Sequence, residues 1–399
     1  MVSAMIILSI SSHVVKMIFI ILLSISILVL QLNKSYSNAQ VKSATFLSEK
    51  LELEPGLCVK KYLFNVEFPK GHIGIKRFDA ELVDEKGKSL SLNETYLHHW
   101  LAVLHLENNA KPKGEGVIAK LNNGPCYSLP HFWGRGSESR GTTSDIPDPF
   151  AVEMGNPEKI PEGYEEKWVL DTMIIDTRGV QDKHGCAQCR CNLYNVTTDV
   201  KGVPLDPEYK GGFNCCYDNT QCKLKEGFHG PRRSVHLRYT IKWVEWDQHQ
   251  IALKVYVLDS TDEVVKNGSK LVHNCKVEYS IIPENGDRKP VNVQKANIPL
   301  EKGGYLIYGV AHQHGGSAGS TLYGQDGRIL CDSRPRYGTG KEPGNEEGYL
   351  VAMSECVPKP GSVKIHDNEI LTLESRYNNT YLTGLMGHFS IFVADKLQQ

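Results

Sequence analysis

Strict alternation between apolar and polar residues is the feature that most constrains how this chain can fold. In the stretch SVHLRYTIKW, every second residue is apolar and those between are mostly polar. Successive side chains of a strand point to opposite faces, so this period predicts a strand with one buried face. The residues of that face are Val235, Leu237, Tyr239, Ile241 and Trp243. No long stretch has helical periodicity, and Gly, Pro and Asn separate the short runs, which predicts an all-β sandwich protein.

The chain is long enough for about two such domains, because a typical domain has roughly 100–200 residues. We expect one β-sandwich at 40–180 and a second at 232–399. The segment between them, 181–231, is irregular and rich in cysteine; it either separates the sandwiches or decorates the end of the first. The formal charge of −1 gives no reason to expect nucleic-acid binding or electrostatic attraction to a membrane.

The first 39 residues have the pattern of a secretory signal peptide. Lys16 precedes an apolar run of 16 residues, and Ser37 and Ala39 then fit a cleavage site with small residues. We expect residues 1–39 to be removed and the chain to be secreted to the extracellular space or cell wall. The alternatives are an uncleaved segment that anchors the chain in a membrane, or delivery to the vacuole. After cleavage, no apolar run is long enough to span a bilayer.

The cysteines and glycosylation motifs fit the same secreted interpretation. Sequons of the N-x-S/T type begin at Asn93, Asn195, Asn267 and Asn378. The chain has 11 cysteines, an odd number, so at least one thiol is left unpaired within the chain. The spacing in 181–231 does not match a paired C-x2-C zinc site, and we expect disulfides there instead. These cysteines are Cys186, Cys189, Cys191, Cys215, Cys216 and Cys222, and the sequence does not choose among their possible pairings.

Two adjacent histidines interrupt the apolar run YLHHWLAVLHL at 96–106. On a regular strand His98 and His99 would point to opposite faces. Both can therefore bind one metal ion only at a β-bulge or at a strand end.

A second histidine motif lies in GGYLIYGVAHQHGG at 303–316. His312 and His314 are two residues apart, so on a strand they point the same way and can converge on one metal ion. In LMGHFSIFVAD, Met386 and His388 share a face in the same manner. A thioether is a soft ligand and favours copper, especially Cu(I). If no metal is bound, the alternatives are that the histidines are only hydrogen-bonded and that the methionine only fills the core.

Three motifs, ETYLHHWLAVL, VAHQHGG and LMGHFSIFV, occur in an order that resembles the type II, ascorbate-dependent copper monooxygenases. That group includes the peptidylglycine α-hydroxylating and dopamine β-type enzymes. Met386 follows His314 by 72 positions, which is similar to the spacing in those enzymes. The stretches FWGRGSESR and WVLDTMIIDT also resemble the region after their His-His pair. Over residues 45–395 the chain most closely resembles the plant family called stress up-regulated Nod 19.

The resemblance implies two tandem jelly-roll domains that each carry one copper ion. His98 and His99 would hold the electron-storing copper. His312, His314 and Met386 would hold the copper that acts on a small-molecule substrate, with His388 as a further ligand or a neighbour of one. Ascorbate would be the reductant, and the protein would be an oxidoreductase.

Two departures from the enzymes affect this interpretation. The enzymes have a third histidine for the first copper, and Met173 occupies the matching place here, so that site either survives with a changed potential or is lost. Val310 and Ser390 stand where the peptide-hydroxylating enzymes clamp a carboxylate, so we do not expect amidation of glycine-extended peptides. The alternatives are a non-catalytic, stress-related glycoprotein and a metal-independent enzyme. His131 and His184 are expected to be ordinary hydrogen-bonding residues.

Overall fold

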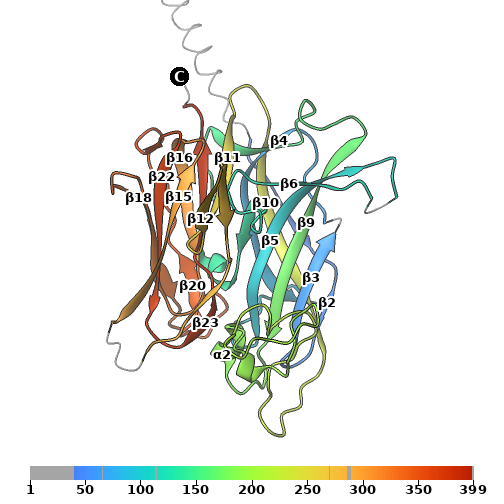
Figure 1. Ribbon diagram of the computed structural model, residues 1–399. Helices are drawn as coiled ribbons and strands as arrows, with labels where there is room; N and C mark the ends of the chain where they lie inside the picture. Colours follow the sequence, from blue (N-terminus) through green and yellow to red (C-terminus); the bar gives the residue numbers. More distant parts are fainter. Residues whose placement is uncertain (1–39, 65, 113–114, 269, 285–288, 398–399) are drawn as a thin grey trace, which may run out of the picture. The chain divides into compact units, whose positions relative to one another are not determined.

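The computed structural model describes residues 40–64, 66–112, 115–268, 270–284 and 289–397. The expected signal peptide at 1–39 lies outside these described residues. From Lys42 onward the described residues form one unit. Nearly all of its regular structure is β-strand (Figure 1), so the predicted all-β class is confirmed. Within the described ranges, no helix combines the length and the apolar character that crossing a bilayer requires.

The largest sheet has nine strands and runs through the whole unit. Its two halves meet where β8 pairs in parallel with β11. In spatial order its strands are β1 (Lys42–Leu47), β10 (Arg233–Glu245), β4 (Ile73–Asp84), β8 (Phe150–Met154), β11 (Ile251–Asp259), β24 (His388–Ala394), β16 (Gly304–His312) and β21 (Lys364–Ile365), with β2 (Leu51–Leu53) also paired to β10.

Two further sheets complete the sandwich layers, and short elements connect them. The five-stranded sheet contains β3 (Cys58–Phe64), β9 (Tyr164–Asp176), β5 (Thr95–Asn108) and β6 (Ile118–Lys120), with β7 (Trp133–Arg135) paired to β5. The four-stranded sheet contains β15 (Val291–Leu300), β22 (Glu369–Asn378), β17 (Ser317–Tyr323) and β18 (Ile329–Ser333). The strand pairs are β12 (Glu263–Asn267) with β13 (Lys270–Asn274), β14 (Tyr279–Ile281) with β23 (Leu382–Leu385), and β19 (Pro335–Tyr337) with β20 (Leu350–Met353). The short helices are η1 (Ser137–Gly141), α2 (Lys183–Ala187) and η2 (Cys191–Leu193).

Aromatic side chains hold the layers together. The ring of Phe78 on β4 lies 5.3 Å from Trp100 on β5 and 6.1 Å from Trp168 on β9. Trp133 on β7 lies 5.6 Å from Phe392 on β24, which joins the first sandwich to the second. Buried aromatic rings dominate core energetics because each removes a large apolar area from water. Residues from the three larger sheets therefore share one hydrophobic core.

Strand β10 follows the predicted alternation but changes the expected division of the chain. Val235, Leu237, Tyr239 and Ile241 are buried as predicted, whereas Trp243 is only half-buried because the register against β4 shifts between Lys242 and Trp243. The strand lies between β1 and β4, so its hydrogen bonds place it in the first sandwich rather than with the residues after 245. Alternation identifies a strand and its buried face, but it does not identify the partner strand. The chain therefore returns to the first sandwich after the cysteine-rich segment, on the C-terminal side of the boundary that we expected at 231–232.

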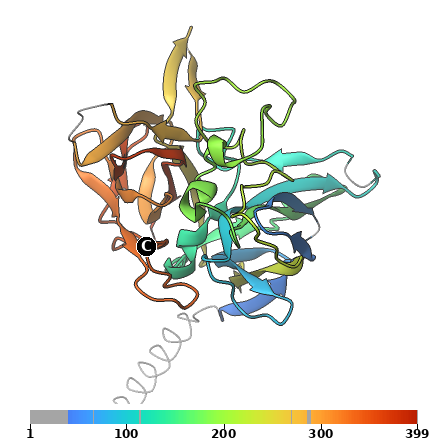
Figure 2. The ribbon, with the colours of Figure 1, turned by 90° about the horizontal axis from the view of Figure 1, so that it is seen from below.

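The cysteine-rich segment at 181–231 lies below the ends of β5 and β9, where Figures 1 and 2 show it as loops around α2. Disulfides pair all six of its cysteines within the segment: Cys186–Cys222, Cys189–Cys216 and Cys191–Cys215. Two more disulfides, Cys126–Cys275 and Cys331–Cys356, lie elsewhere. Cys58 is the cysteine left unpaired, and burial raises the pKa of its thiol to about 12, so it stays protonated.

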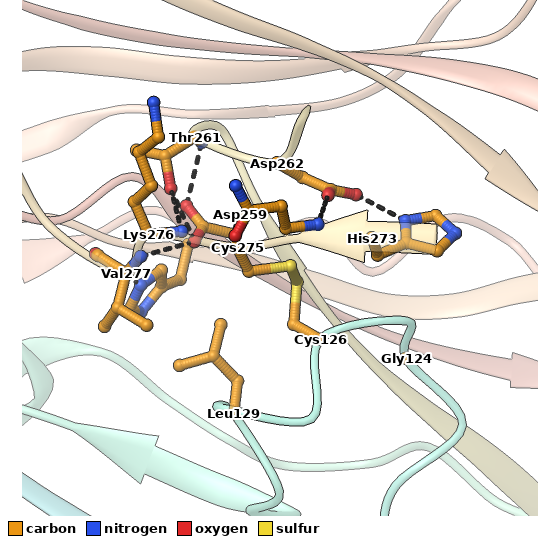
Figure 3. The surroundings of a disulfide bond; sticks show 12 residues. Gly124, Cys126, Leu129, Asp259, Thr261, Asp262, His273, Cys275, Lys276 and Val277 are labelled. Carbon is orange, nitrogen blue, oxygen red and sulfur yellow. Dashed lines mark hydrogen bonds and ion pairs between the residues drawn. A yellow bond between two sulfur atoms is a disulfide. The ribbon is translucent and has the colours of Figure 1, made fainter. Parts of the chain in front are cut away.

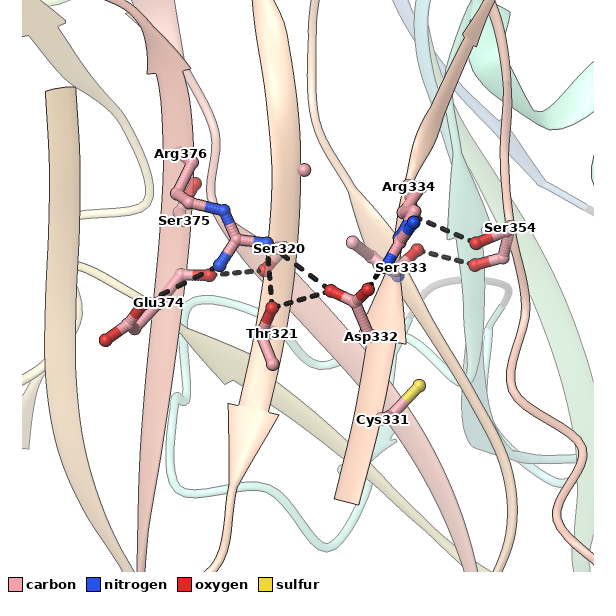
Figure 4. Close-up of polar contacts among 12 residues, drawn as sticks. Ser320, Thr321, Cys331, Asp332, Ser333, Arg334, Ser354, Glu374, Ser375 and Arg376 are labelled. Carbon is pink, nitrogen blue, oxygen red and sulfur yellow. Dashed lines mark hydrogen bonds and ion pairs between the residues drawn. The ribbon is translucent and has the colours of Figure 1, made fainter. Parts of the chain in front are cut away.

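The asparagines of the four sequons differ in how exposed their side chains are. The side chains of Asn195, Asn267 and Asn378 are exposed, whereas Asn93 is half-buried. In the four-stranded sheet, Figure 4 shows Asp332 of the edge strand β18 directed toward Thr321 of β17 and Arg376 of β22. Its carboxylate accepts from Thr321 Oγ1 at 2.7 Å and forms an ion pair with Arg376 at 3.4 Å. Asp332 and Arg376 are partly exposed, whereas Thr321 on the strand between them is buried.

Candidate metal centre

A β-bulge resolves the problem posed by the adjacent histidines. Strand β5 pairs with β9 so that Leu97 lies opposite Ile174 and His99 opposite Met173, which leaves His98 as the extra residue. A bulge re-aims side chains locally. The His98 and His99 rings lie 5.6 Å apart, and each lies 5.9 Å from Phe213 of the cysteine-rich segment. Both imidazoles therefore face the same side of the sheet.

The strand opposite this pair presents a carboxylate that the sequence analysis did not single out. Asp171 and Met173 share a face of β9, and Asp171 Oδ1 lies 3.9 Å from His99 Nε2. Met173 is fully buried and belongs to a hydrophobic cluster that includes Cys58, Tyr96 and cysteines of the insert. Asp171 precedes Met173 by two residues, so a period-2 reading of the strand that carries Met173 would have placed this carboxylate on the same face.

The second group of expected ligands comes together where β16 ends and β24 begins. His312 lies directly opposite His388 in the pairing of these strands. The Nε2 atom of His312 lies 3.3 Å from Nε2 of His314 and 3.2 Å from Sδ of Met386. All three side chains are buried. Residues 74 positions apart in the chain thus present two imidazole nitrogens and a thioether to one point.

Glu138 in η1 fixes the orientation of His312. Its carboxylate accepts a hydrogen bond from His312 Nδ1. A neutral imidazole has a single N–H, so this bond leaves Nε2 unprotonated and facing Met386 and His314. Burial alone would raise the pKa of Glu138, but its interaction with His312, which includes the hydrogen bond, outweighs burial and lowers that pKa, so the carboxylate stays ionised. Glu138 lies in the stretch FWGRGSESR of the first sandwich, to which the sequence analysis assigned no ligand or supporting role.

Tyr377 on β22 connects the two loops that carry the ligands. The backbone N–H of His314 donates to Tyr377 Oη at 2.7 Å, and Tyr377 Oη donates to the carbonyl of Met386 at 2.7 Å. Hydrogen bonds of this kind hold a loop in place because the buried backbone groups have no other partner. The positions of His314 and Met386 are therefore coupled through a single phenol.

His388 is a neighbour of this group, and its orientation is fixed by the backbone. Its ring stacks on His312 at 5.7 Å, and its Nε2 donates to the carbonyl of Val277 at 3.0 Å. Only Nδ1 of His388 then remains to act as a ligand. Burial lowers the pKa of His388 to about 4, so the ring is uncharged at neutral pH.

The other histidines of the cluster are also uncharged and lack partners. Burial lowers the pKa of His98, His99, His131 and His314. Within the part of the chain that the structure describes, both ring nitrogens of His98 and of His99, and Nδ1 of His314, have no hydrogen-bond partner. A buried polar atom without a partner costs about 1–3 kcal/mol, and a native protein has few of them. These unpaired imidazole nitrogens are of the type that can bind a metal ion.

The two expected groups of ligands are in contact. The rings of His98 and His314 lie 4.5 Å apart, edge to face. The structure therefore arranges the predicted residues as one continuous cluster: His98, His99, His312, His314, Met386 and His388. Met173 lies on the flank of this cluster, opposite His99.

A cavity of about 370 Å³ opens onto the cluster. His99, His312, Met386 and His388 line it, together with Asp171. His131, which we expected to be an ordinary hydrogen-bonding residue, lines the same cavity. His184 does not line it, and its ring packs 4.9 Å from the ring of Tyr349. A cavity of this size suits a small molecule, since ligand pockets measure about 300–1,000 Å³.

A disulfide fixes the wall of this cavity. Cys126 and Cys275 join the loop that carries Leu129 to the segment that carries Val277, and Figure 3 shows both beside the bond. Asp259 lies close to these sulfurs, but its carboxylate accepts from Thr261 and from the backbone of Val277 at 2.9 Å. Because the sulfurs are bonded to each other, this group shapes a loop and offers no thiolate ligand.

The fold and the cluster define an all-β, disulfide-bonded protein with a buried histidine–methionine centre. Over residues 39–396 the chain matches the family described as Stress up-regulated Nod 19, and it belongs to that family. No curated protein matches the chain. Among solved structures, the VP2 subviral particle of infectious bursal disease virus is 11% identical, with a TM-score of 0.17 over 90% of this chain and 73% of that one. The Cry4Aa toxin of Bacillus thuringiensis is 10% identical, with a TM-score of 0.18 over 90% and 53%. TM-scores this low identify no shared fold.

Proposed function

We propose that this protein is a copper-dependent oxidoreductase of the monooxygenase type that acts on a small molecule in the cavity. The observation that carries the proposal is the meeting of His312 Nε2 with His314 Nε2 at 3.3 Å and with Met386 Sδ at 3.2 Å. Two imidazoles and a thioether form a soft donor set, which selects copper, and Cu(I) in particular, over calcium or magnesium.

The spacing of the donor atoms supports a shared ion. Two nitrogens that each bind one tetrahedral ion at about 2.0–2.1 Å lie about 3.3–3.4 Å apart. The two Nε2 atoms of His312 and His314 lie 3.3 Å apart. With the proton of His312 directed to Glu138, a neutral His312 presents only its Nε2 lone pair to Met386, and a cation between them removes that unfavourable contact.

The protein's own groups would orient and shield this centre. Glu138 holds the imidazole of His312 and increases its basicity, as carboxylates behind metal-bound histidines do. Tyr377 fixes the relative positions of His314 and Met386. Burial of all three ligands excludes water from the side away from the cavity.

Copper held there would supply one-electron redox chemistry. With ascorbate as reductant and O₂ as oxidant, one oxygen atom would enter a C–H bond of the substrate and the other would leave as water, while ascorbate becomes dehydroascorbate. The order of the His-His, H-x-H and Met motifs, which resembles the type II copper monooxygenases, supports this reaction class. The five disulfides support an oxidising compartment, and we propose that the protein is secreted to the extracellular space as a glycoprotein.

A second candidate function is copper binding without turnover. Met173 stands where the resemblance implies a third histidine, and it belongs to the hydrophobic cluster of the cysteine-rich segment. The expected electron-storing site is then incomplete. A stress-related protein that only sequesters copper would need the His312 end of the cluster alone.

Copper content tests the proposal first. The secreted protein and its His312→Ala, His98→Ala and His249→Ala variants would be reconstituted with Cu(I), and copper per chain would be measured by elemental analysis. His249 lies in an exposed turn and serves as the matched control. We expect one tightly bound copper that only His312→Ala removes. Wild-type protein that retains no copper after reconstitution would refute the proposal.

Oxygen uptake separates the two candidate functions. Uptake in the presence of ascorbate would be measured on the same four proteins at equal total copper, because free copper also consumes oxygen with ascorbate. Uptake that exceeds the His312→Ala rate supports turnover. Equal rates at full copper occupancy of the wild type would leave only sequestration.

A further inference from the structure

Some residues that line the cavity are not part of the histidine–methionine cluster. Lys60 and Tyr62 of β3 line the cavity, facing Phe213 of the cysteine-rich segment. Tyr127, from the loop that the Cys126–Cys275 disulfide fixes, stands at the same cavity. Sequence motifs singled out none of these residues, and the proposed reaction does not use them.

Lys60 is the one permanent cation among the residues that line the cavity. Its ammonium group lies over the rings of Phe213, at 5.5 Å, and Tyr62, at 5.8 Å. Among the described residues, no ion pair within 4.0 Å involves Lys60, although most lysines of this protein near a carboxylate form one. Lys60 is half-buried, and its ammonium lies against two ring faces without an ion pair among the described residues, so it retains the capacity to bind an anion.

Three carboxyl groups near Lys60 form no ion pair with its ammonium, and one of them, Asp218, accepts from the Lys60 backbone N–H at 2.9 Å and pairs with Lys61. Asp171 lies beside His99 at 3.9 Å. Glu278 accepts from Tyr209 Oη at 2.7 Å and from the backbone of Phe213 at 3.0 Å. The Lys60 charge acts on the pKa of Glu278, but the larger effect of burial raises that pKa to about 7, and none of the three carboxyl groups forms an ion pair with Lys60, so the ammonium can pair with a ligand.

The walls around Lys60 are apolar or aromatic. Tyr62 is 55% exposed and Tyr127 is 82% exposed, which is unusual for large aromatic residues and marks the mouth of the cavity. Deeper in, the wall is aliphatic, with Leu101, Val103, Val169 and Leu129 as its members. A flat ring would bury these surfaces, since aromatic pairs gain energy beyond the area they cover.

We infer that the cavity binds a small aromatic carboxylate, whose carboxylate group pairs with Lys60 and whose ring packs beside Phe213, between the mouth and the His312–Met386 end. The inference rests on the proposed function only in calling this ligand the substrate; binding itself does not require copper. A single ring with a short acidic chain fits a volume of about 370 Å³.

Calorimetric titration with three probes tests whether the cavity selects a ligand with a negative charge and an aromatic ring. The probes are trans-cinnamate, its uncharged match cinnamamide, and phenethylamine, an aromatic cation. Binding would be measured for the wild type, Lys60→Met, Lys60→Arg and Lys61→Met. Lys61 is the next residue of β3, is exposed, and pairs with Asp218, which does not line the cavity, so it is a matched control.

We expect cinnamate to bind at least tenfold more tightly than cinnamamide. Lys60→Met should remove that preference, whereas Lys60→Arg should keep most of it and Lys61→Met should leave it unchanged. Equal binding of cinnamate and cinnamamide, or cinnamate binding unaffected by Lys60→Met, would overturn the inference. Tighter binding of phenethylamine, abolished by Asp171→Asn, would also overturn it and assign the site to a cation.

The same titrations distinguish this inference from the proposed function. They would be run on copper-free and on copper-reconstituted protein. Cinnamate binding without any copper uptake would uphold the aromatic-anion site and refute the copper centre. Copper uptake without cinnamate binding would uphold the copper centre and refute the aromatic-anion site. Thermal unfolding of each variant would confirm that it folds as the wild type does.

Discussion

The His98–His99 end and the His312–His314–Met386 end of the cluster are built differently, although they touch. At the His312 end, Glu138 and Tyr377 fix the ligands, and the donor atoms already lie 3.2–3.3 Å apart. At the His98 end, all four ring nitrogens lack partners, and the nearest carboxylate lies 3.9 Å away.

This difference indicates which end of the cluster should bind a metal ion more tightly. A site whose ligands are held by further hydrogen bonds loses little entropy when the ion binds, whereas an unsupported pair must be ordered by the ion itself. Lys60 adds to the contrast, because its positive charge contributes to lowering the pKa of both His98 and His99, after the larger effect of their burial. We therefore expect the His312 end to bind the first copper.

Replacing the thioether should have the largest effect on copper. Met386→Ala removes the soft donor, and we expect Cu(I) affinity to fall at least 100-fold, because two imidazoles alone favour Cu(I) less. Competition with a chromophoric Cu(I) chelator measures this. Met173→Ala is the comparison at the other end, and we expect it to change Cu(I) affinity less than threefold. A larger loss with Met173→Ala than with Met386→Ala would reverse our ranking of the two ends.

Removing the carboxylates behind the histidines should have the next largest effect. Glu138→Gln should weaken copper binding about 10–100-fold, the usual cost of losing a carboxylate behind a metal-bound histidine. Asp171→Asn should weaken it less than threefold, since Asp171 lies 3.9 Å from His99. The same competition assay applies. Equal effects of the two substitutions would mean that both ends hold the ion.

The contact that holds Phe213 over the His98 end should depend on pH. Burial raises the pKa of Glu278 to about 7. A carboxyl group whose pKa is raised by folding stabilises the folded state below its unfolded pKa, and this contribution is lost as the pH rises through about 7. The wild type should therefore lose stability from pH 5 to pH 8 that Glu278→Gln keeps. Relative to wild type, the free energy of unfolding of the variant should rise by about 1–2 kcal/mol over this range, after allowance for the partial exposure of Glu278. Chemical unfolding at both pH values measures this, and a pH-independent difference would contradict it.

Removing unpaired nitrogens should have the smallest effect. His98→Phe keeps an aromatic ring but eliminates the two nitrogens that lack partners. We expect the copper-free protein to gain about 1 kcal/mol of stability, because a buried polar group without a partner is costly. His312→Phe should destabilise instead, since it leaves the Glu138 carboxylate buried without its partner. Thermal unfolding without metal gives both values, and a loss of stability with His98→Phe would show that its nitrogens are satisfied.

Periodicity predicted strands well and their partners poorly. It identified the buried face of β10 correctly, yet it could not show that this strand lies between β1 and β4. The expectation that His98 and His99 need a bulge followed from strand geometry alone, and the bulge is present. Glu138 escaped notice because its role depends on a contact with His312, 174 positions away.

The sequence by itself determined the all-β class, the disulfide-rich insert and the residue types that could bind a metal. These properties follow from local alternation, residue composition and short spacings, which a linear chain records directly. Only the tertiary structure decided the disulfide pairing, the supports from Glu138 and Tyr377, the contact between His98 and His314, and the unpaired ammonium of Lys60. Each of these depends on distances between residues far apart in the chain, and those distances are set by sheet order and register rather than by local pattern.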